Sequence, residues 1–272
     1  MSKVHWALAI NGNPGLAEWD IGPHFYFWHD RNDGGNITPL FSSPHVNVLQ
    51  EEESTRAYIR IKTLLRLLSG INILRGDDIF YHHSTLEYVK DNLFRTGTWT
   101  EDIDVTIEEL GNPFDENILN DIQLNRIRRG SEEPSLVKDY IELSVNESLV
   151  REVLLLLTLG EEETIYFLIN TYKIFENIRN DLGLKVSNRK IHGRKDLPSE
   201  LLESLSKLAG YSQYINSKDA SGILSRHGSG NTPSPKDKPS LIEIKRALRL
   251  AVSTWMKYKC EISFGRVYKP TH

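Results

Sequence analysis

The chain has 272 residues, of which 39% are apolar and 26% are charged, a balance that is typical of a folded globular protein and excludes a disordered one. Its single cysteine, Cys260, excludes a disulfide framework within the chain and a metal cluster held by several thiolates. The net charge of −4 favours no class of partner until the chain is divided into two parts.

The two parts of the chain carry opposite charge. Residues 165–272 contain 19 Lys+Arg and 9 Asp+Glu, a net charge of +10. Residues 1–164 contain the other 14 of the 33 basic residues and 28 of the 37 acidic residues, a net charge of −14. A basic part of this kind often faces nucleic acid, a phosphate ligand or an acidic partner protein. The alternative is that the two parts attract each other, within one chain or between subunits of a homo-oligomer.

The apolar segments are shorter than a secretion signal or a membrane span requires. Near the N-terminus the apolar stretch covers only Trp6 to Ile10, and Gly12 and Pro14 follow it. The longest apolar run, Val153 to Leu157, is far below the roughly 20 residues that cross a bilayer. We therefore expect a cytoplasmic protein with no membrane-spanning segment, and the single cysteine suits a reducing compartment.

The first part of the chain is expected to be α+β, with a small and mostly antiparallel sheet. Segments rich in β-branched and aromatic residues alternate with glycine, proline and asparagine turns, which indicates strands. The turns are expected at residues 11–15 and 30–36. The expected strands are Val4–Ile10, His24–His29, His45–Leu49, Asp77–His83 and Asp102–Leu110.

One helix of this part is expected over Glu51–Ser69. Its apolar residues recur at helical spacing, and three glutamates in the first turn suit the positive end of the helix dipole. Gly70 stands where a glycine commonly ends a helix, so we expect the helix to stop there.

The second part is expected to be an all-helical bundle. Residues 111–134 read as the connection between two domains, with a helix in Ile118–Ile127 as an open alternative. Ser144 and Glu147 match a capping box before the next helix. The expected helices are Leu149–Leu159, Glu161–Leu182, Pro198–Leu208 and Leu241–Tyr258. We thus expect an acidic α+β domain over residues 1–130 and a basic helical domain over residues 135–272.

The segment Ser221–Arg249 is the strongest candidate for a site. Arg226 and His227 lie among glycines, whose bare N–H groups can approach an anion closely, and more cations follow. The expected phosphate-binding residues are Arg226, Lys236, Lys238, Lys245, Arg246 and Arg249. His227 is the candidate general acid or base for phosphodiester cleavage, because imidazole is the usual side chain for proton transfer. The alternative is a structural turn with its arginine on helix carbonyls and its lysines in solvent.

No motif for a cofactor or a metal stands out. Glycine-rich nucleotide loops and the helical zinc motif of metalloproteases do not occur in the sequence. His82 and His83 follow two aspartates, but adjacent residues of a strand point to opposite faces and cannot readily hold one ion. We expect neither a cofactor nor a metal.

Two segments, Leu64–Leu74 and Ser225–Arg249, resemble segments that recur in uncharacterised bacterial proteins of this length. Those proteins have a β-containing first half and a helical second half with an arginine-histidine corner before the last helix. The resemblance covers about a third of the chain. It implies the same two-part organisation and a bacterial origin, and it implies no activity.

Arg179 and Asn180, late on a long helix, resemble the start of the Arg-x4–6-His motif of HEPN ribonucleases. The motif would place a histidine at position 184, 185 or 186, where the chain has Leu184, Lys185 and Val186. The resemblance therefore implies a HEPN-like helical bundle at most, and the RNase activity does not carry over.

These patterns lead to a ranked expectation of function. We expect a soluble, bacterial-type interaction protein or complex subunit whose basic helical part binds nucleic acid, a nucleotide or another phosphate-bearing ligand. The alternative is a HEPN-like or other phosphodiester-cleaving effector that uses His227, of the kind that acts in bacterial defence. The sequence leaves open whether the protein is an enzyme.

Overall fold

A computed structural model gives the structure of the chain and describes residues 4–11, 21–31, 37–129, 135–187, 190–192, 194, 196–227, 232–266 and 268. The chain forms two compact units, which we call the sheet unit (Met1–Ser69 and Asp78–Ser148) and the helical unit (Gly70–Asp77 and Leu149–His272). The sheet unit holds 12 Lys+Arg and 23 Asp+Glu, a charge of −11, and the helical unit 21 and 14, a charge of +7. The opposite charge expected from the sequence thus follows the structural units. The predicted domain limits, 1–130 and 135–272, stay a prediction.

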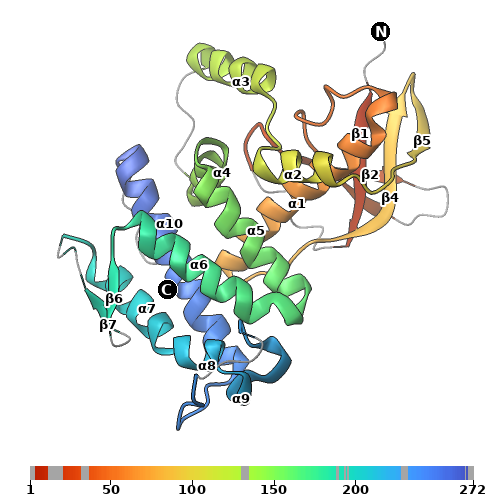
Figure 1. Cartoon of the computed structure of the whole chain (residues 1–272). Helices are drawn as coiled ribbons and strands as arrows, with labels where there is room; N and C mark the ends of the chain where they lie inside the picture. Colours follow the sequence, from red (N-terminus) through yellow and green to blue (C-terminus); the bar gives the residue numbers. More distant parts are fainter. Residues whose placement is uncertain are drawn as a thin grey trace. The chain divides into compact units, whose positions relative to one another are not determined.

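The sheet unit contains the small antiparallel sheet that the sequence predicted, so the fold class is α+β (Figure 1). The strands pair in the order β2-β3-β1-β4-β5, and every pairing is antiparallel. Their bounds are β1 (His5–Asn11), β2 (Tyr26–Arg31), β3 (Ile37–Ser42), β4 (Tyr81–Lys90) and β5 (Leu93–Gly97). The predicted turns at 11–15 and 30–36 lie largely outside the described residues.

The middle strand β1 is buried on both of its faces. Successive side chains of a strand point to opposite faces, so Ala7 and Ala9 face one side, where they pack with Leu40. On the other face, the Trp6 ring packs against Tyr88 with ring centroids 4.9 Å apart. The Trp6 Nε1–H group donates a hydrogen bond of 3.2 Å to the carbonyl of Leu49. The core of this unit therefore lies on both sides of β1.

The long helix α1 (Ser54–Arg75) confirms the predicted helix but does not end at Gly70. A Cβ atom at position 70 would lie 2.8 Å from the carbonyl oxygen of Leu154 and 3.1 Å from its Cβ. Leu154 belongs to α5 (Ser148–Glu162), so the two helices cross with almost no space between their backbones. Gly70 is required for this close approach and not for a helix stop.

The predicted strand Asp102–Leu110 is wrong, because the segment forms helix α2 (Ile103–Gly111). Apolar and polar residues alternate at its start, as they do in a strand. Asp102, however, is a helix cap: its Oδ1 atom accepts hydrogen bonds of 3.1 Å from the N–H groups of Asp104 and Val105. The cap satisfies donors that a helix start leaves without partners, and this decides the conformation.

The predicted strand His45–Leu49 is also wrong. The segment folds into successive turns in which the N–H groups of Val46 and Asn47 bond to the carbonyl of Ser43, at 3.1 and 3.3 Å. The predicted strand Asp77–His83 overlaps β4 only from Tyr81 onward.

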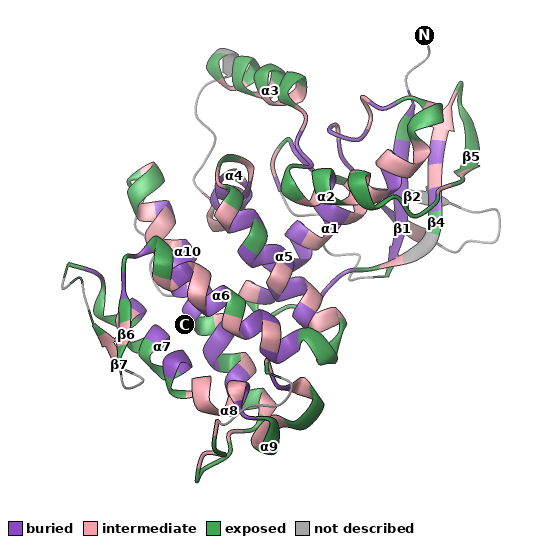
Figure 2. Ribbon diagram, in the orientation of Figure 1, coloured by how far each residue is buried: buried purple, intermediate pink, exposed green. Residues whose placement is uncertain are grey.

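The sheet unit has more helices than the single one predicted. Helix α3 (Glu116–Arg129) confirms the helix that the sequence left open, and it is exposed or half-buried along its described side chains (Figure 2). Helix α4 (Leu136–Asn146) follows. The predicted capping box at Ser144 is wrong, because Ser144 lies inside α4 and its hydroxyl donates to the Ile141 carbonyl at 2.7 Å.

The helical unit contains the end of α1, helix α5, the helices that follow α5 and one small hairpin. The helices are α6 (Phe167–Asp181), α7 (Ser199–Gly210), α8 (Ser212–Asn216), α9 (Lys218–Ser221) and α10 (Leu241–Phe264), with single turns η3 (Thr164–Tyr166) and η4 (Gly222–Leu224). The hairpin joins β6 (Lys185–Ser187) and β7 (Lys190–His192) and departs from the all-helical prediction.

The last helix, α10, is the longest of the described elements. It begins at Leu241, as its sequence predicts, and runs past the predicted end at Tyr258 to Phe264. Ser240 and Glu243 form a capping box, and Gly265 ends the helix at a φ of +63°. Two polar contacts fix the buried face of α10. Trp255 Nε1–H donates to Asp181 of α6 at 2.9 Å, and the Thr254 hydroxyl lies 3.0 Å from that of Ser204 in α7.

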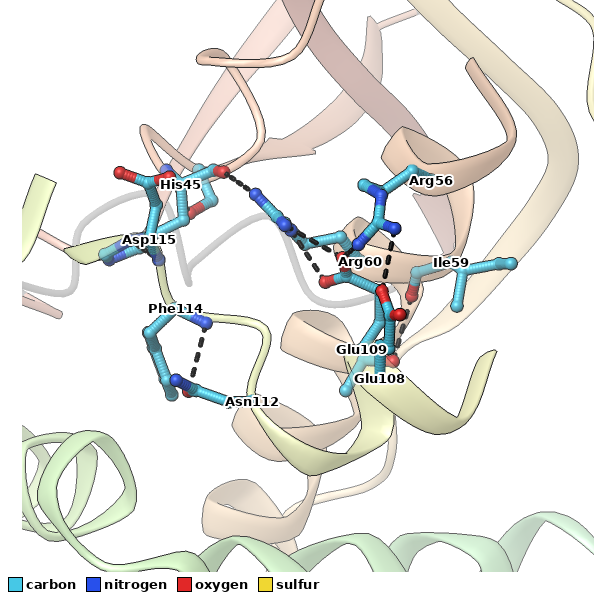
Figure 3. Close-up of polar contacts among 11 residues, drawn as sticks. His45, Arg56, Ile59, Arg60, Glu108, Glu109, Asn112, Phe114 and Asp115 are labelled. Carbon is cyan, nitrogen blue, oxygen red and sulfur yellow. Dashed lines mark hydrogen bonds and ion pairs between the residues drawn. The ribbon is translucent and has the colours of Figure 1, made fainter. Parts of the chain in front are cut away.

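A buried carboxylate, Glu109, holds α2 against α1 (Figure 3). Its side chain is 1% exposed, and it accepts hydrogen bonds from Arg56 at 2.9 Å and from Arg60 at 2.7 and 2.8 Å. Arg60 also donates to the carbonyl of His45 at 3.0 Å. The neighbouring Glu108 pairs with Arg56 at 2.7 Å, but its side chain is 60% exposed.

We predict that Glu109→Gln lowers the free energy of unfolding by about 3 kcal/mol, because it removes the charge that two half-buried guanidinium groups share. Glu108→Gln is the matched control and should cost less than about 1 kcal/mol, since water screens this exposed pair. Urea unfolding followed by circular dichroism measures both. Equal effects of the two substitutions would contradict the assignment of Glu109 as the central carboxylate.

We predict that Gly70→Ala destabilises the protein by about 1–2 kcal/mol, although alanine favours a helix more than glycine does. The added methyl group would press on backbone atoms of α5. Gly210→Ala is the control, because a Cβ at the end of α7 meets no atom within 4 Å. Thermal unfolding should show a lower midpoint for Gly70→Ala only; unchanged stability of Gly70→Ala would show that the helices do not cross this closely.

Candidate anion-binding surface of the helical unit

Arg226, the centre of the sequence-predicted site, is held on helix α6. Its backbone N–H donates to the carbonyl of Ile215 at 2.9 Å, which fixes the chain just after η4. Its guanidinium lies over the ring of Tyr172, 3.9 Å from the centroid. Its Nη2 atom lies 3.7 Å from a carboxylate oxygen of Glu176, one helical turn after Tyr172. The guanidinium is thus oriented by a ring and a carboxylate, and its side chain keeps 32% exposure.

His227 is exposed at the end of this corner. Its backbone N–H donates to the hydroxyl of Ser225 at 3.3 Å, while Ser225 itself is buried. The glycines at 228 and 230, which the sequence expected to approach an anion, lie outside the described residues.

Lys245 and Arg249 form a second group of cations, on α10. Both bind Glu161 at the end of α5: Lys245 by a short ion pair, and Arg249 through Nη2 at 3.2 Å. One carboxylate therefore neutralises one of these two charges. The Nε–H group of Arg249 is buried and has no hydrogen-bond partner among the described residues, so this guanidinium keeps a spare donor.

Lys236, Lys238 and Arg246 are exposed. Lys238 lines a cavity of about 370 Å³. The other residues of this cavity are Gly210, Tyr211, Tyr214, Pro235, Asp237, Pro239 and Glu243. Glu243 closes the N-terminus of α10 through the capping box, and the hydrogen bond from the Ser240 N–H lowers the pKa of its carboxyl. An anion would therefore meet the side-chain cations and not the helix N-terminus.

The predicted residues thus form three groups: Arg226 on α6, Lys245 with Arg249 on Glu161, and the exposed Lys236, Lys238 and Arg246. The structure joins Lys245 to Arg249 through one carboxylate, and it places Arg226 against a different one. That all six cations bind one phosphate-bearing ligand stays a prediction.

The HEPN resemblance has no histidine to complete it. Helix α6 ends at Asp181, and Arg179 turns its guanidinium to the Oδ1 atom of Asn180, at 3.0 and 3.3 Å. The next histidine, His192, stands on strand β7.

The sequence did not reveal a buried histidine relay in the sheet unit. The N–H of Asp115 donates to His45 Nδ1 at 3.0 Å, so the ring proton of His45 must sit on Nε2. His45 Nε2 lies 3.0 Å from His24 Nδ1, and His24 Nε2 lies 3.0 Å from Glu142. Each ring therefore donates to the next group, and Arg126 closes the relay on Glu142. Only the folded chain brings these residues together, because 118 positions separate His24 from Glu142.

Both ends of the relay are shifted away from protonation. Burial lowers the pKa of His45 to about 3, helped by repulsion from Arg60 and from His24 whenever His24 is protonated. Burial alone would raise the pKa of Glu142, but the hydrogen bonds from Arg126 and His24 outweigh it and lower this pKa to about 2. At neutral pH the relay thus consists of neutral His45 and ionised Glu142.

Among the described residues, no three His, Cys, Asp or Glu side chains gather closely enough to hold a metal ion. In the same part of the chain no helix has the length and apolar character of a bilayer span.

Comparisons with protein-family models, with curated proteins and with solved structures found nothing that matches this chain.

We predict that acid destabilises the protein from about pH 6.5 downward. The unfolded chain binds a proton at His45 near pH 6.5, whereas the folded chain does so only near pH 3, so the free energy of unfolding falls as the pH falls between these values. Glu142 adds the same trend between pH 4.5 and 2. One such group contributes about 1.4 kcal/mol per pH unit.

Urea unfolding between pH 6.5 and 4.5 measures this slope. His45→Gln removes one titrating group, so its slope should be lower by about 1.4 kcal/mol per pH unit, whatever its stability at neutral pH. An unchanged slope in the variant would show that His45 takes up its proton in the folded protein.

Proposed function

We propose that the protein is a binding protein whose helical unit holds the phosphate groups of a nucleic acid or a nucleotide. The support is the combination of a unit charge of +7 with exposed cations placed within a few residues of each other. Lys236 and Lys238 stand just before α10, and Arg246 lies in its second turn. Since a helix rises about 1.5 Å per residue, Arg246 is about 7.5 Å along the axis from the start of α10. Exposed cations thus extend from the segment before α10 into its second turn, where several phosphates of one strand can meet them.

Arg249 supports the same proposal. Its guanidinium is already oriented by Glu161, and its side chain keeps 28% exposure. A phosphate oxygen can accept charge-assisted hydrogen bonds from the exposed part of such a guanidinium. Arg226 offers a second oriented guanidinium, which stacks on the ring of Tyr172. Guanidinium groups also stack on bases and bind phosphates.

Two other functions make different predictions. If the oppositely charged units bind each other in a homo-oligomer or bind a partner protein, the protein has no affinity for nucleic acid. If His227 cleaves phosphodiesters, the bound nucleic acid is shortened with time, and His227→Ala stops this without changing affinity.

We predict that the protein binds labelled single-stranded RNA or DNA in fluorescence anisotropy, with an affinity that falls steeply with salt. The triple variant Lys236→Ala/Lys238→Ala/Arg246→Ala removes three phosphate contacts. The slope of log K against log salt should therefore decrease by about 2, since each contact on a single strand contributes about 0.7.

The control is Lys173→Ala/Lys185→Ala/Lys218→Ala, which removes the same charge from other exposed positions of the helical unit. It should keep the slope of the unchanged protein. Equal losses in both triple variants would mean that only net charge matters, and no binding at low salt would overturn the proposal. Light scattering over the same salt series tests the homo-oligomer alternative, because the mass of an oligomer held by opposite charges falls as the salt concentration rises.

A further inference from the structure

The sheet unit contains a cavity that the sequence did not indicate and that the proposed function does not use. It measures about 580 Å³, within the range of sites for small molecules. Helix α1, helix α2 and the segment between β5 and α2 form its walls, so we call it the α1–α2 cavity. Its residues are Tyr58, Ile59, Lys62, Thr63, Arg66, Trp99, Thr100, Glu101, Asp102, Ile103, Thr106 and Leu110.

Two stacked aromatic rings form one wall of the α1–α2 cavity. The rings of Tyr58 and Trp99 are nearly parallel, with an angle of 8° and centroids 3.8 Å apart. The ring of His82 meets Tyr58 edge-on at 6.0 Å. Tyr58 is 4% exposed, so neighbours hold the pair in place. A rigid aromatic wall of this kind binds planar rings at a small cost in conformational entropy.

Two cations stand on the same face of α1 as Tyr58. Lys62 and Arg66 follow it at intervals of four residues, which places the three side chains one above another. The Lys62 ammonium lies 5.6 Å from the centre of the Tyr58 ring. Burial raises the pKa of Tyr58, so its hydroxyl stays neutral and does not repel an anion. The sheet unit as a whole is acidic, and these cations give the α1–α2 cavity a local positive end.

The opposite wall, on α2, offers a hydrogen-bond acceptor. The Thr106 hydroxyl donates to the carbonyl of Asp102 at 2.6 Å, so its proton is engaged and it presents only lone pairs to a ligand. On α1 the Thr63 hydroxyl donates to the carbonyl of Ile59 at 2.9 Å and is almost fully buried. Glu101 adds an exposed carboxylate. A ligand that fits must therefore combine an anionic group, a flat ring and donors on that ring.

We propose that the α1–α2 cavity binds a small aromatic anion of mononucleotide size, with its anionic group on Lys62 and Arg66 and its ring against Trp99. Nucleoside monophosphates have this chemistry, and so do aromatic carboxylates that carry an amino group. The shared requirement is one anionic end and one flat end with N–H donors. The site lies in the sheet unit, so it is independent of the nucleic-acid surface proposed for the helical unit.

Isothermal titration calorimetry of the full chain tests the site with separate probes. Adenosine monophosphate and guanosine monophosphate represent nucleotides, and 4-aminobenzoate represents aromatic carboxylates that carry an amino group on the ring. Ribose 5-phosphate lacks the ring, and adenosine lacks the anion. We expect one complete probe to bind at a ligand concentration of about 1 mM or below, and both incomplete probes to bind at least tenfold more weakly. The class of probe that binds more tightly, nucleotide or aromatic carboxylate, identifies the class of the ligand.

Three variants locate the binding. Lys62→Gln/Arg66→Gln should weaken it at least tenfold, and Trp99→Ala about tenfold, because stacking on an aromatic side chain is lost. Ile103→Glu places a carboxylate on a wall residue that is 71% exposed, so it repels the anion without disturbing the core. Ile103→Glu keeps the test decisive if either of the other variants fails to fold.

The control is Arg95→Gln, which removes one positive charge from an exposed position on β5 outside the α1–α2 cavity. It should bind the probe as the unchanged protein does. The proposal is overturned if no complete probe binds, if Ile103→Glu binds normally, or if Arg95→Gln weakens binding as much as the cavity variants. The triple variant of the helical unit should bind the probe normally, so this result does not depend on the proposed function.

Discussion

The buried carboxylate of Glu109 is the constraint from which the architecture of the sheet unit follows. Two guanidinium groups of α1 converge on it, and one of them also holds the carbonyl of His45 (Figure 3). His45 in turn accepts from the backbone of Asp115, at the start of α3. One carboxylate therefore fixes α2, the turns after β3 and the segment that leads to α3. Burying a single unpaired charge is so unfavourable that these partners must stay together.

The position of α2 also determines the shape of the α1–α2 cavity. Ile103, Thr106 and Leu110 form one side of the α1–α2 cavity, while Tyr58, Lys62 and Arg66 form the other. Glu109 lies on α2 between Thr106 and Leu110, and its partners Arg56 and Arg60 flank Tyr58 on α1. The ion pairs thus set the distance between the two walls. Rigid walls of this kind favour a preformed site for a small molecule.

Carboxylates also decide which cations of the helical unit are available. Glu161 holds Lys245 and Arg249, and Glu176 holds Arg226, so these side chains are oriented but partly neutralised. Lys236, Lys238 and Arg246 are exposed. A surface of this kind combines directed guanidinium donors with exposed charge. The first gives geometry to an interaction with phosphate, and the second gives long-range attraction that salt weakens.

The sequence alone determined the features that depend on neighbouring residues. Alternation predicted β1, spacing predicted α1, and Pro239 with Ser240 predicted the start of α10, because each signal acts within a few residues. Counting charges along the chain found the opposite sign of the two units, because a sum over residues needs no knowledge of their contacts. The cations of 226–249 could be named as candidates, but not the carboxylates that pair with them.

Only the tertiary structure decided the features that join distant segments. The sequence predicts a helix stop at Gly70, whereas in the structure this glycine gives room for Leu154 of α5. The alternation after Asp102 predicts a strand, whereas the carboxylate of Asp102 caps helix α2. The contacts of the relay join residues that are 21 and 118 positions apart, and the stacked Tyr58 and Trp99 are 41 positions apart. No local pattern encodes such contacts. They form because the chain must bury its apolar surface while most of its buried polar groups find partners.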